Sequence, residues 1–322
     1  MNDGWRPSAG IDALRLRARL LERVREYFRV RDVLEVETPV AVARTVSDPQ
    51  IESLQLTGDA PRYLHTSPEY AMKRLLAAGS GDVFQVCKVF RAGERSALHN
   101  PEFTMIEWYR VEMDLQGIMA ETAGLASLLL ADGWPHAGLP VEYLDYQAAF
   151  RRELQVDPLE VPMAVLAPLC VKHGLAAGSA ADASRDQLLD FLVATQIGPN
   201  LGRHGLTCLH HYPASQAALA QLDAGDARTA LRFELYAAGV ELANGYVELA
   251  DAGEQARRFV LDQQLRQVRG LASIEADERL LAALQSGLPP CAGVALGFDR
   301  VAMLAAGATR IDAVLAFPWE RA

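Results

Sequence analysis

Cysteine is scarce in this chain of 322 residues, and the four that occur form no Cys-x-x-Cys pair. Zinc sites built from thiols and disulfide frameworks both need cysteines at short or regular spacings. The four positions are instead far apart in the sequence: Cys87, Cys170, Cys208 and Cys291. We therefore expect reduced thiols, as in the cytoplasm, and no zinc site.

Long apolar segments and an excess of positive charge are also missing. No stretch approaches the roughly 18 apolar residues of a membrane span, and residues 1–7 contain no apolar core of a secretory signal. The formal net charge is -10, which disfavours nucleic acid as the main partner because phosphates are neutralised by clustered Lys and Arg. The arginines between Arg15 and Arg31 are typical of the solvated face of an amphipathic helix.

Half of the residues are hydrophobic, which is enough for a substantial core. Apolar residues recur at helical spacing between Ile11 and Val30, and segment 114–205 has a mostly helical pattern interrupted by prolines. We expect that segment to be an insertion in a single domain that spans residues 1–322. Short apolar runs predict strands at 34–39, 83–90, 103–109, 206–212, 232–236, 239–242 and 245–249, and a strand-to-helix unit at 293–300. Hairpins with helices outside them indicate an α+β fold with a mainly antiparallel sheet.

The loop between the strands expected at 83–90 and 103–109 is rich in polar donors. Arg91, Arg95, His99 and Asn100 would all lie at the mouth of this hairpin. A polyanion such as ATP is bound by donors of this kind when they are held on rigid elements. The hairpin is therefore the first candidate for a nucleotide site.

Two further patterns carry chemistry. Glu234, Glu241 and Glu248 lie seven residues apart on one hairpin system, and carboxylate oxygens suit Mg²⁺, which bridges substrate phosphates. An equally acceptable interpretation is that they are exposed strand glutamates. Near the C-terminus, Gly293–Arg300 joins a glycine-containing strand to a helix whose first turn would carry an arginine, a combination that suits an anionic ligand.

These segments resemble the conserved blocks of class II lysyl-tRNA synthetases, in the same order and over nearly the whole chain. Phe90-Arg91 with His99–Tyr109 resembles motif 2, Gly293–Arg300 resembles motif 3, and Glu241–Leu249 resembles the acidic block between them. Leu34–Pro39 resembles motif 1, which lies at a dimer interface in that class. The resemblance implies a class II catalytic domain, ATP and Mg²⁺ as ligands, and a homodimer.

Few residues precede the expected first helix, so we expect no OB-fold domain for anticodon binding. With Trp108 after Glu107 and the turn Ser67–Tyr70, the chain is similar to the elongation factor P–(R)-β-lysine ligase family. This resemblance implies that (R)-β-lysine is activated as an adenylate and transferred to a lysine of elongation factor P, with no tRNA. A truncated synthetase relative that activates α-lysine for another acceptor is the alternative, and a non-catalytic binding module is a third reading.

The family motifs imply roles for individual positions in the nucleotide site. Arg91 would contact the α-phosphate and the reacting carboxylate, and Arg300 would hold the terminal phosphates, so these two are the catalytic candidates. Asn100 would meet the adenine side, Phe103 would stack on the ring, and Gly297 would lie against the nucleotide. The complete implied set is Arg91, Gly93, Glu94, His99, Asn100, Phe103, Glu241, Leu242, Gly297 and Arg300.

The resemblance also implies an amino-acid pocket and a metal site. Glu248 and Tyr109 would bind the distal ammonium and Glu69 the other amino group, which agrees with the need of a dicationic substrate for one carboxylate per ammonium. An acidic substrate such as aspartate would be repelled. The remaining pocket residues are Ser67, Pro68 and Ala295, and the Mg²⁺ ligands are Glu234 and Glu241.

Two departures from the lysyl-tRNA synthetase pattern stand out. The family has Arg-Asn-Glu where this chain has Arg91-Ala92-Gly93-Glu94, so the glutamate contact to ATP is either supplied by Glu94 or absent. Ala295 replaces a glycine, and its methyl group would reshape the pocket wall in favour of β-lysine. No general base for the transfer step is evident in the sequence.

Overall fold

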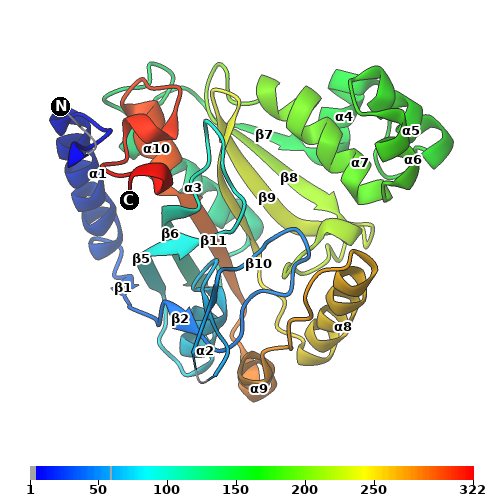
Figure 1. Ribbon diagram of the computed structural model, residues 1–322, viewed down its shortest axis with the longest axis horizontal. Helices are drawn as coiled ribbons and strands as arrows, with labels where there is room; N and C mark the ends of the chain where they lie inside the picture. Colours follow the sequence, from blue (N-terminus) through cyan, green and yellow to red (C-terminus); the bar gives the residue numbers. More distant parts are fainter. Residues whose placement is uncertain (1–4, 59) are drawn as a thin grey trace.

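A large sheet forms the centre of the protein (Figure 1). The computed structural model describes residues 5–58 and 60–322; residues 1–4, part of the segment in which we expect no signal, lie outside them. The sheet has eight strands in the order β1-β5-β6-β11-β10-β9-β8-β7. Its strands are β1 (Leu34–Glu35), β5 (Val83–Phe90), β6 (Glu102–Val111), β7 (Glu142–Asp145), β8 (Thr207–Pro213), β9 (Thr229–Ala237), β10 (Val240–Val247) and β11 (Cys291–Gly297).

The six central strands pair antiparallel, and only the outermost pairs, β1 with β5 and β7 with β8, are parallel. This confirms the expected α+β fold. The expected strand at 245–249 is not a separate element, because β10 continues through a bulge between Glu241 and Ala243 and runs to Val247. A small second sheet has the order β2-β4-β3, with β2 (Ala41–Val42), β3 (Gln55–Leu56) and β4 (Arg62–Leu64).

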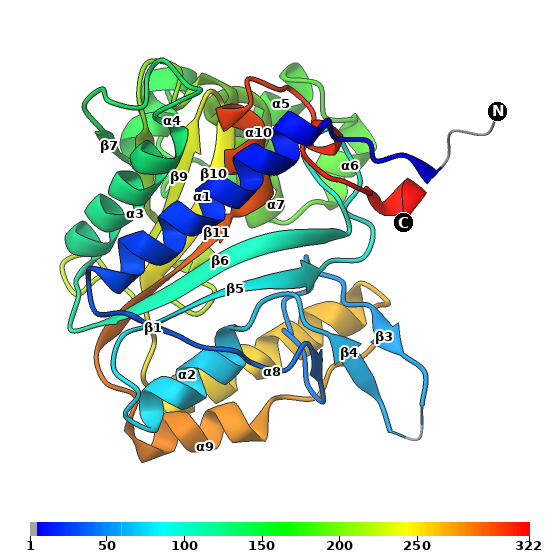
Figure 2. The ribbon, with the colours of Figure 1, turned by 90° about the vertical axis from the view of Figure 1, so that its left-hand side faces the viewer.

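Helices cover both faces of the large sheet (Figure 2). The first face carries α1, α3 and α10, and the second carries α2, α8 and α9 at one end and α4 to α7 at the other. The helices are α1 (Ile11–Arg29), α2 (Glu69–Ala77), α3 (Leu115–Leu130), α4 (Tyr146–Leu154), α5 (Met163–Lys172), α6 (Ala177–Asp182), α7 (Arg185–Leu192), α8 (Ala252–Val268), α9 (Glu278–Gly287) and α10 (Phe298–Ala305).

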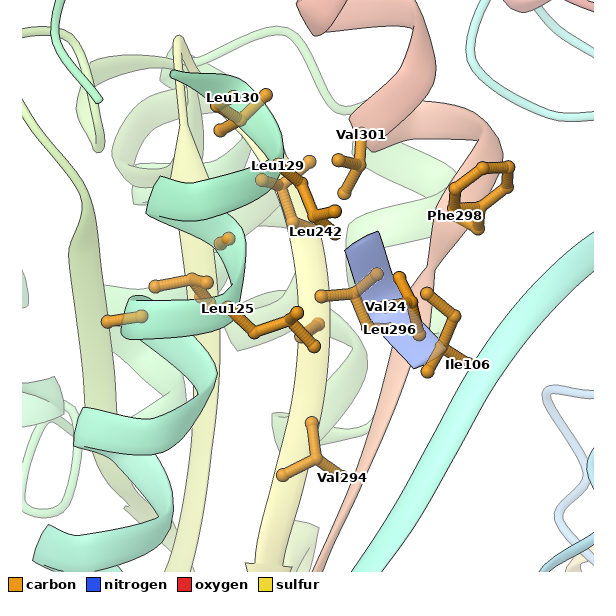
Figure 3. Packing of buried hydrophobic residues seen from close by; sticks show 14 of the residues in the cluster. Val24, Ile106, Leu125, Leu129, Leu130, Leu242, Val294, Leu296, Phe298 and Val301 are labelled. Carbon is orange, nitrogen blue, oxygen red and sulfur yellow. The ribbon is translucent and has the colours of Figure 1, made fainter. Parts of the chain in front are cut away.

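Alternation along the strands separates the main core from the second face. Ile106 on β6, together with Val294 and Leu296 on β11, points into the core beneath α1, α3 and α10, where Val24 and Leu125 meet it (Figure 3). Because successive strand residues point to opposite faces, the intervening residues face the other way. Between the two groups of helices on that second face, the sheet carries mainly polar side chains and glycines.

The segment from 114 to 205 divides between two cores. Helix α3 packs on the main core through residues such as Leu125 and Leu129. A second apolar cluster begins at Tyr146 and joins α4 to α7 with Leu209 and Tyr236 of the sheet. The independently packed helical part thus starts after β7.

Two expectations from the sequence concern membrane-spanning segments and the state of the cysteines. None of the helices within residues 5–58 and 60–322 is long and apolar enough to cross a membrane. All four cysteines are free, and three of them are buried.

Candidate active site

The β5–β6 hairpin presents Arg91 to the second face of the sheet. Phe90 pairs with Glu102, and the Arg91 backbone N–H donates to Pro101 O over 2.9 Å, so the arginine follows directly on the rigid ladder. Its guanidinium lies 5.2 Å from the centre of the Phe103 ring, and Nη1 is 3.6 Å from Glu94 Oε1. Its Nε is buried without a hydrogen-bond partner among the described residues, so a donor remains available for an anion.

Arg300 lies in the first turn of α10, as predicted, and is held against the hairpin loop. Its Nη2 lies 2.6 Å from His99 Nε2, its Nη1 donates to Glu241 O over 2.8 Å, and Nε donates to Leu98 O over 3.3 Å. Burial and the neighbouring charge of Arg300 lower the pKa of His99. A neutral imidazole can accept from Arg300 through Nε2 while Nδ1 bonds Ser96 Oγ, 2.7 Å away.

The three glutamates at seven-residue spacing do not form one group. Glu234 accepts from Arg232 Nη2 (2.7 Å) and from the Tyr236 hydroxyl (2.6 Å). Burial and the nearby Glu234 carboxylate raise the pKa of Glu241, which is expected where two carboxylates share a site that a divalent cation would relieve. Glu248 lies seven residues further along the strand, roughly 23 Å at about 3.3 Å per residue.

Glu248 belongs to a second, buried cluster. Its side chain is 1% exposed, and Oε2 lies 2.5 Å from Lys73 Nζ. The same ammonium donates to Glu69 Oε1 over 2.7 Å, and the Tyr246 hydroxyl donates to that oxygen over 2.7 Å. Although burial opposes it, the carboxylates of Glu248 and Glu69 raise the pKa of Lys73. Glu248 Oε1 is buried without a hydrogen-bond partner among the described residues.

Glu107 is the third carboxylate of this cluster. It accepts from the Tyr109 hydroxyl and from Ser67 Oγ, each over 2.7 Å, and Ser67 Oγ in turn accepts from the Glu69 N–H at the start of α2. Burial, reinforced by the charge of Glu69, raises the pKa of Glu107 to about 8. Burial also raises the pKa of Glu248 to about 8, against the attraction of Lys73.

The charge balance of this cluster defines its ligand. Three carboxylates face one ammonium, so the fully ionised cluster holds two uncompensated negative charges in a buried place. Burying unpaired charge is costly, and a ligand with two ammonium groups would compensate it. Gly293 makes the space, because a Cβ there would lie 2.4 Å from both Glu248 Oε1 and the Tyr109 ring.

Three residues of the predicted ATP-binding set have surroundings that the motifs did not indicate. The Leu242 side chain is buried in the main core, so only its backbone faces the site. Asn100 has partners within the protein at both ends of its amide, donating to Glu102 O and accepting from the Trp319 N–H. A Cβ at Gly297 would meet protein atoms only at ordinary contact distances, so the protein itself does not require glycine there.

Three further predicted positions are Pro68, Ala295 and Gly93. Pro68 precedes the first turn of α2, and Ala295 on β11 pairs with Glu107 of β6. Gly93 has φ +76, a conformation that glycine adopts without strain, in the turn between Arg91 and Glu94.

Sequence reasoning missed Lys73, Glu107 and Tyr246. Lys73 lies four residues after Glu69, a spacing that puts both on one helix face. Glu107 lies two residues before Tyr109 and Tyr246 two before Glu248, spacings that put both members of each pair on one face of the sheet. These signals were available for side chains near Glu69, Tyr109 and Glu248, but no local pattern could show that the three segments meet.

Comparison with known proteins gives the family of the chain. The model of the family described as tRNA synthetases class II (D, K and N) matches residues 5–321. An elongation factor P–(R)-β-lysine ligase of Pseudoalteromonas translucida is 46% identical over 325 residues, covering 99% of this chain and 98% of the relative. The ligase of Pectobacterium atrosepticum is 46% identical with the same coverage, and that of Pasteurella multocida is 44% identical over 327 residues, 99% of each chain.

Proposed function

This chain belongs to the elongation factor P–(R)-β-lysine ligases of the class II tRNA synthetase family, and we propose that it activates (R)-β-lysine with ATP and transfers it to a lysine side chain of elongation factor P. The chain is an ATP-dependent ligase that forms AMP and pyrophosphate. The observation that carries the choice of amino acid is the buried cluster of three carboxylates and one lysine, whose excess of two negative charges suits a substrate with two ammonium groups.

In the first step, a carboxylate oxygen of the amino acid attacks the α-phosphorus of ATP. The bond from the α-phosphorus to the bridging oxygen breaks, pyrophosphate leaves, and an aminoacyl adenylate forms. Arg91, whose Nε is unpaired within the described protein, would hold the α-phosphate and the carboxylate together. Arg300 would exchange its bonds to His99 and to the Glu241 carbonyl for phosphate oxygens.

Mg²⁺ would be held by Glu234 and Glu241, and when bound it supplies charge neutralisation for the phosphates. The fit rests on the pairing of β9 with β10, which sets Glu241 opposite Tyr236, two residues from Glu234, so that both carboxylates lie on one face of neighbouring strands. Arg232 and Tyr236 fix Glu234 in place, so the protein itself orients one ligand before any nucleotide binds.

In the second step, the neutral amine of an acceptor lysine attacks the carbonyl carbon of the adenylate. The carbonyl–oxygen bond to AMP breaks, an amide forms, and the amine loses a proton. His99 is poorly placed to accept that proton, because its pKa is lowered and its two ring nitrogens are engaged by Arg300 and Ser96. We propose that an oxygen of the leaving phosphate accepts it.

The test is incubation of the protein with ATP, Mg²⁺, purified unmodified elongation factor P and each lysine isomer in turn, read by intact mass. We expect a mass increase equal to one β-lysyl group with (R)-β-lysine. A faster reaction with α-lysine would favour the truncated synthetase relative, and no modification with any isomer would overturn the proposal. Ala295, which pairs with Glu107 at the pocket wall, is the residue expected to decide between the isomers.

We also propose a homodimer that works in the cytoplasm, where a translation factor is found. A groove runs along α1 and β1 and is lined by Arg19, Arg23, Val30, Leu34 and Phe84 among others. Val30 and Leu34 are more than half exposed in the single chain, as expected of apolar residues that a second copy would cover. A monomer by light scattering at micromolar concentration would contradict the dimer.

A further inference from the structure

Three side chains of types that can bind a metal lie where β7 and β8 pair in parallel at one edge of the large sheet (Figure 1). Asp145 is the last residue of β7 and pairs directly with His210 of β8. His211 follows on the same strand. One ligand atom from each of these three residues lies within 4.8 Å of the others, and all three residues are half-buried.

The backbone at this point is shaped to bring the two imidazoles together. Consecutive residues of a regular strand point to opposite faces of the sheet. Here His211 has φ 57, in the left-handed region, and the pairing of β8 with β9 shifts register between His210 and Tyr212. The bulge places the ring centres 4.8 Å apart and the two Nδ1 atoms 2.5 Å apart. Bulges of this kind re-aim side chains and are treated as specific features of a fold.

Neighbouring groups hold these side chains in orientations that suit metal binding. The Nε2 atom of His211 lies 3.4 Å from Asp223 Oδ2, so a carboxylate can take the proton-bearing nitrogen while Nδ1 is left to bind. Asp145 Oδ1 accepts from the Gln147 N–H over 2.8 Å at the start of α4, which fixes the orientation of its carboxylate.

We propose that Asp145, His210 and His211 bind one transition-metal dication of the zinc class, with water completing the coordination. Two imidazole nitrogens and a carboxylate oxygen favour Zn²⁺, Ni²⁺ or Co²⁺ over Mg²⁺, which prefers oxygen ligands only. Binding requires the two Nδ1 atoms to move apart to about 3 Å or slightly more, given metal–nitrogen bonds of about 2.0–2.1 Å. The expectation of no zinc site rested on cysteine spacing and does not apply to this group.

A metal at this position would stabilise the attachment of the helical unit α4 to α7 to the sheet. Asp145 begins α4, and α4 to α7 pack as their own cluster. A metal held by Asp145 and the two histidines would join the first turn of that helical unit to β8. We therefore expect the metal to raise the unfolding temperature of the protein without being required for adenylate formation.

The experiment uses the full-length protein after treatment with a chelator. Zn²⁺ is titrated in millimolar Mg²⁺, which occupies the carboxylate site of Glu234 and Glu241, and Co²⁺ absorption reports nitrogen coordination. We expect one equivalent of Zn²⁺ per chain. His210→Gln and Asp145→Asn are expected to weaken binding by about 100-fold or more, and Asp223→Asn by about 10-fold as for other outer-shell partners.

The matched controls are His173→Gln, at the end of α5, and the double change His136→Gln/His204→Gln, which removes another pair of neighbouring rings, 6.2 Å apart. These variants should bind Zn²⁺ as the parent does. Circular dichroism without metal verifies that each variant is folded. Absence of equimolar binding at micromolar Zn²⁺, or unchanged binding by a folded His210→Gln protein, would overturn the proposal and leave the pair as a hydrogen bond between rings.

Discussion

The acidic pocket (Glu69, Lys73, Glu107 and Glu248) and the proposed nucleotide region around Arg91 and Arg300 are built in opposite ways. In the pocket, the Glu248 side chain is 1% exposed and Lys73 is 2% exposed, and tyrosine and serine hydroxyls fix the other carboxylates. In the nucleotide region, the side chains of Arg91 and Arg300 are 25% and 20% exposed. Arg300 is held there by carbonyl oxygens and one imidazole nitrogen.

The difference shows how each region would choose its ligand. The pocket holds carboxylates whose ionised forms the protein compensates only in part, so a ligand without two positive groups gains little there. The arginines instead use acceptors that phosphate oxygens can replace one for one. The pocket would therefore select the amino acid, and the arginines would bind ATP by exchanging their protein acceptors for phosphate oxygens. Changes on either side of this division should affect one substrate and spare the other.

The largest expected effect is from Glu248→Gln. The change keeps the shape of the side chain but removes one of the two unbalanced charges, and losing a buried charge partner costs about 3–5 kcal/mol. We expect kcat/KM for (R)-β-lysine in pyrophosphate exchange to fall by about 100- to 4,000-fold, with the ATP dissociation constant nearly unchanged.

Glu102→Gln is the matched control. That glutamate lies on β6 near the hairpin, its side chain is 40% exposed, and its ion pair with Lys88 is weak, with 3.7 Å between Oε1 and Lys88 Nζ. It should leave both substrates nearly unaffected. An equal loss of ATP and amino-acid binding in the Glu248 variant would mean that the two regions are not separate.

Arg300→Met tests the other side of the division, with a slightly smaller effect. It removes a charged fork that makes three contacts, and hydrogen bonds to charged groups contribute about 1.5–3 kcal/mol each. We expect ATP binding, measured by calorimetry, to weaken about 100-fold while (R)-β-lysine binding changes little. Arg310→Met removes an exposed arginine that pairs with Asp312 and serves as the control. Loss of amino-acid binding in the Arg300 variant would break the comparison.

The third prediction is that stability depends on pH and that the pocket releases protons when it binds its ligand. Burial holds the pKa of Glu107 and of Glu248 at about 8, against about 4.5 unfolded, so between these values the free protein binds more protons than the unfolded chain. Stability of the free protein should therefore fall as pH rises from about 4.5 to 8. A dicationic ligand favours the ionised carboxylates, so its binding near pH 7 should release protons.

Calorimetry in two buffers of different ionisation enthalpy measures this release. We expect between one and two protons per (R)-β-lysine bound, and a smaller number in Glu107→Gln. That variant should also be more stable than the parent above pH 8, because it no longer buries an ionised carboxylate at that position. Binding without proton release would show that the pocket is already ionised in the free protein and would remove its contrast with the nucleotide region.

The nucleotide hairpin could be predicted from sequence because its information is local. Two apolar strands flank one loop, and Arg91 keeps its place at the strand end. The pocket could be predicted only in part, because Lys73 of α2 meets Glu248 after β10 across a long stretch of chain. Seven-residue spacing suggested one group of three glutamates, but the rise along an extended strand separates Glu248 from the others. The bulge at His211 has no signal in composition or periodicity.

The smallest expected effect is from Glu94→Gln, at the loosest match to the synthetase motifs. Glu94 lies 3.6 Å from Arg91 and is 30% exposed, so the pair is partly screened and contributes about 0–1 kcal/mol. We expect the KM for ATP to change by less than about fivefold, with no change in the KM for (R)-β-lysine. Glu320→Gln, which removes the exposed partner of Arg95, gives the baseline for a surface charge. A rise of about 100-fold in the KM for ATP with Glu94→Gln would instead mean that Glu94 makes the ATP contact that the synthetase motif assigns to a glutamate at position 93. The nucleotide region would then depend on a fixed acidic group much as the pocket does.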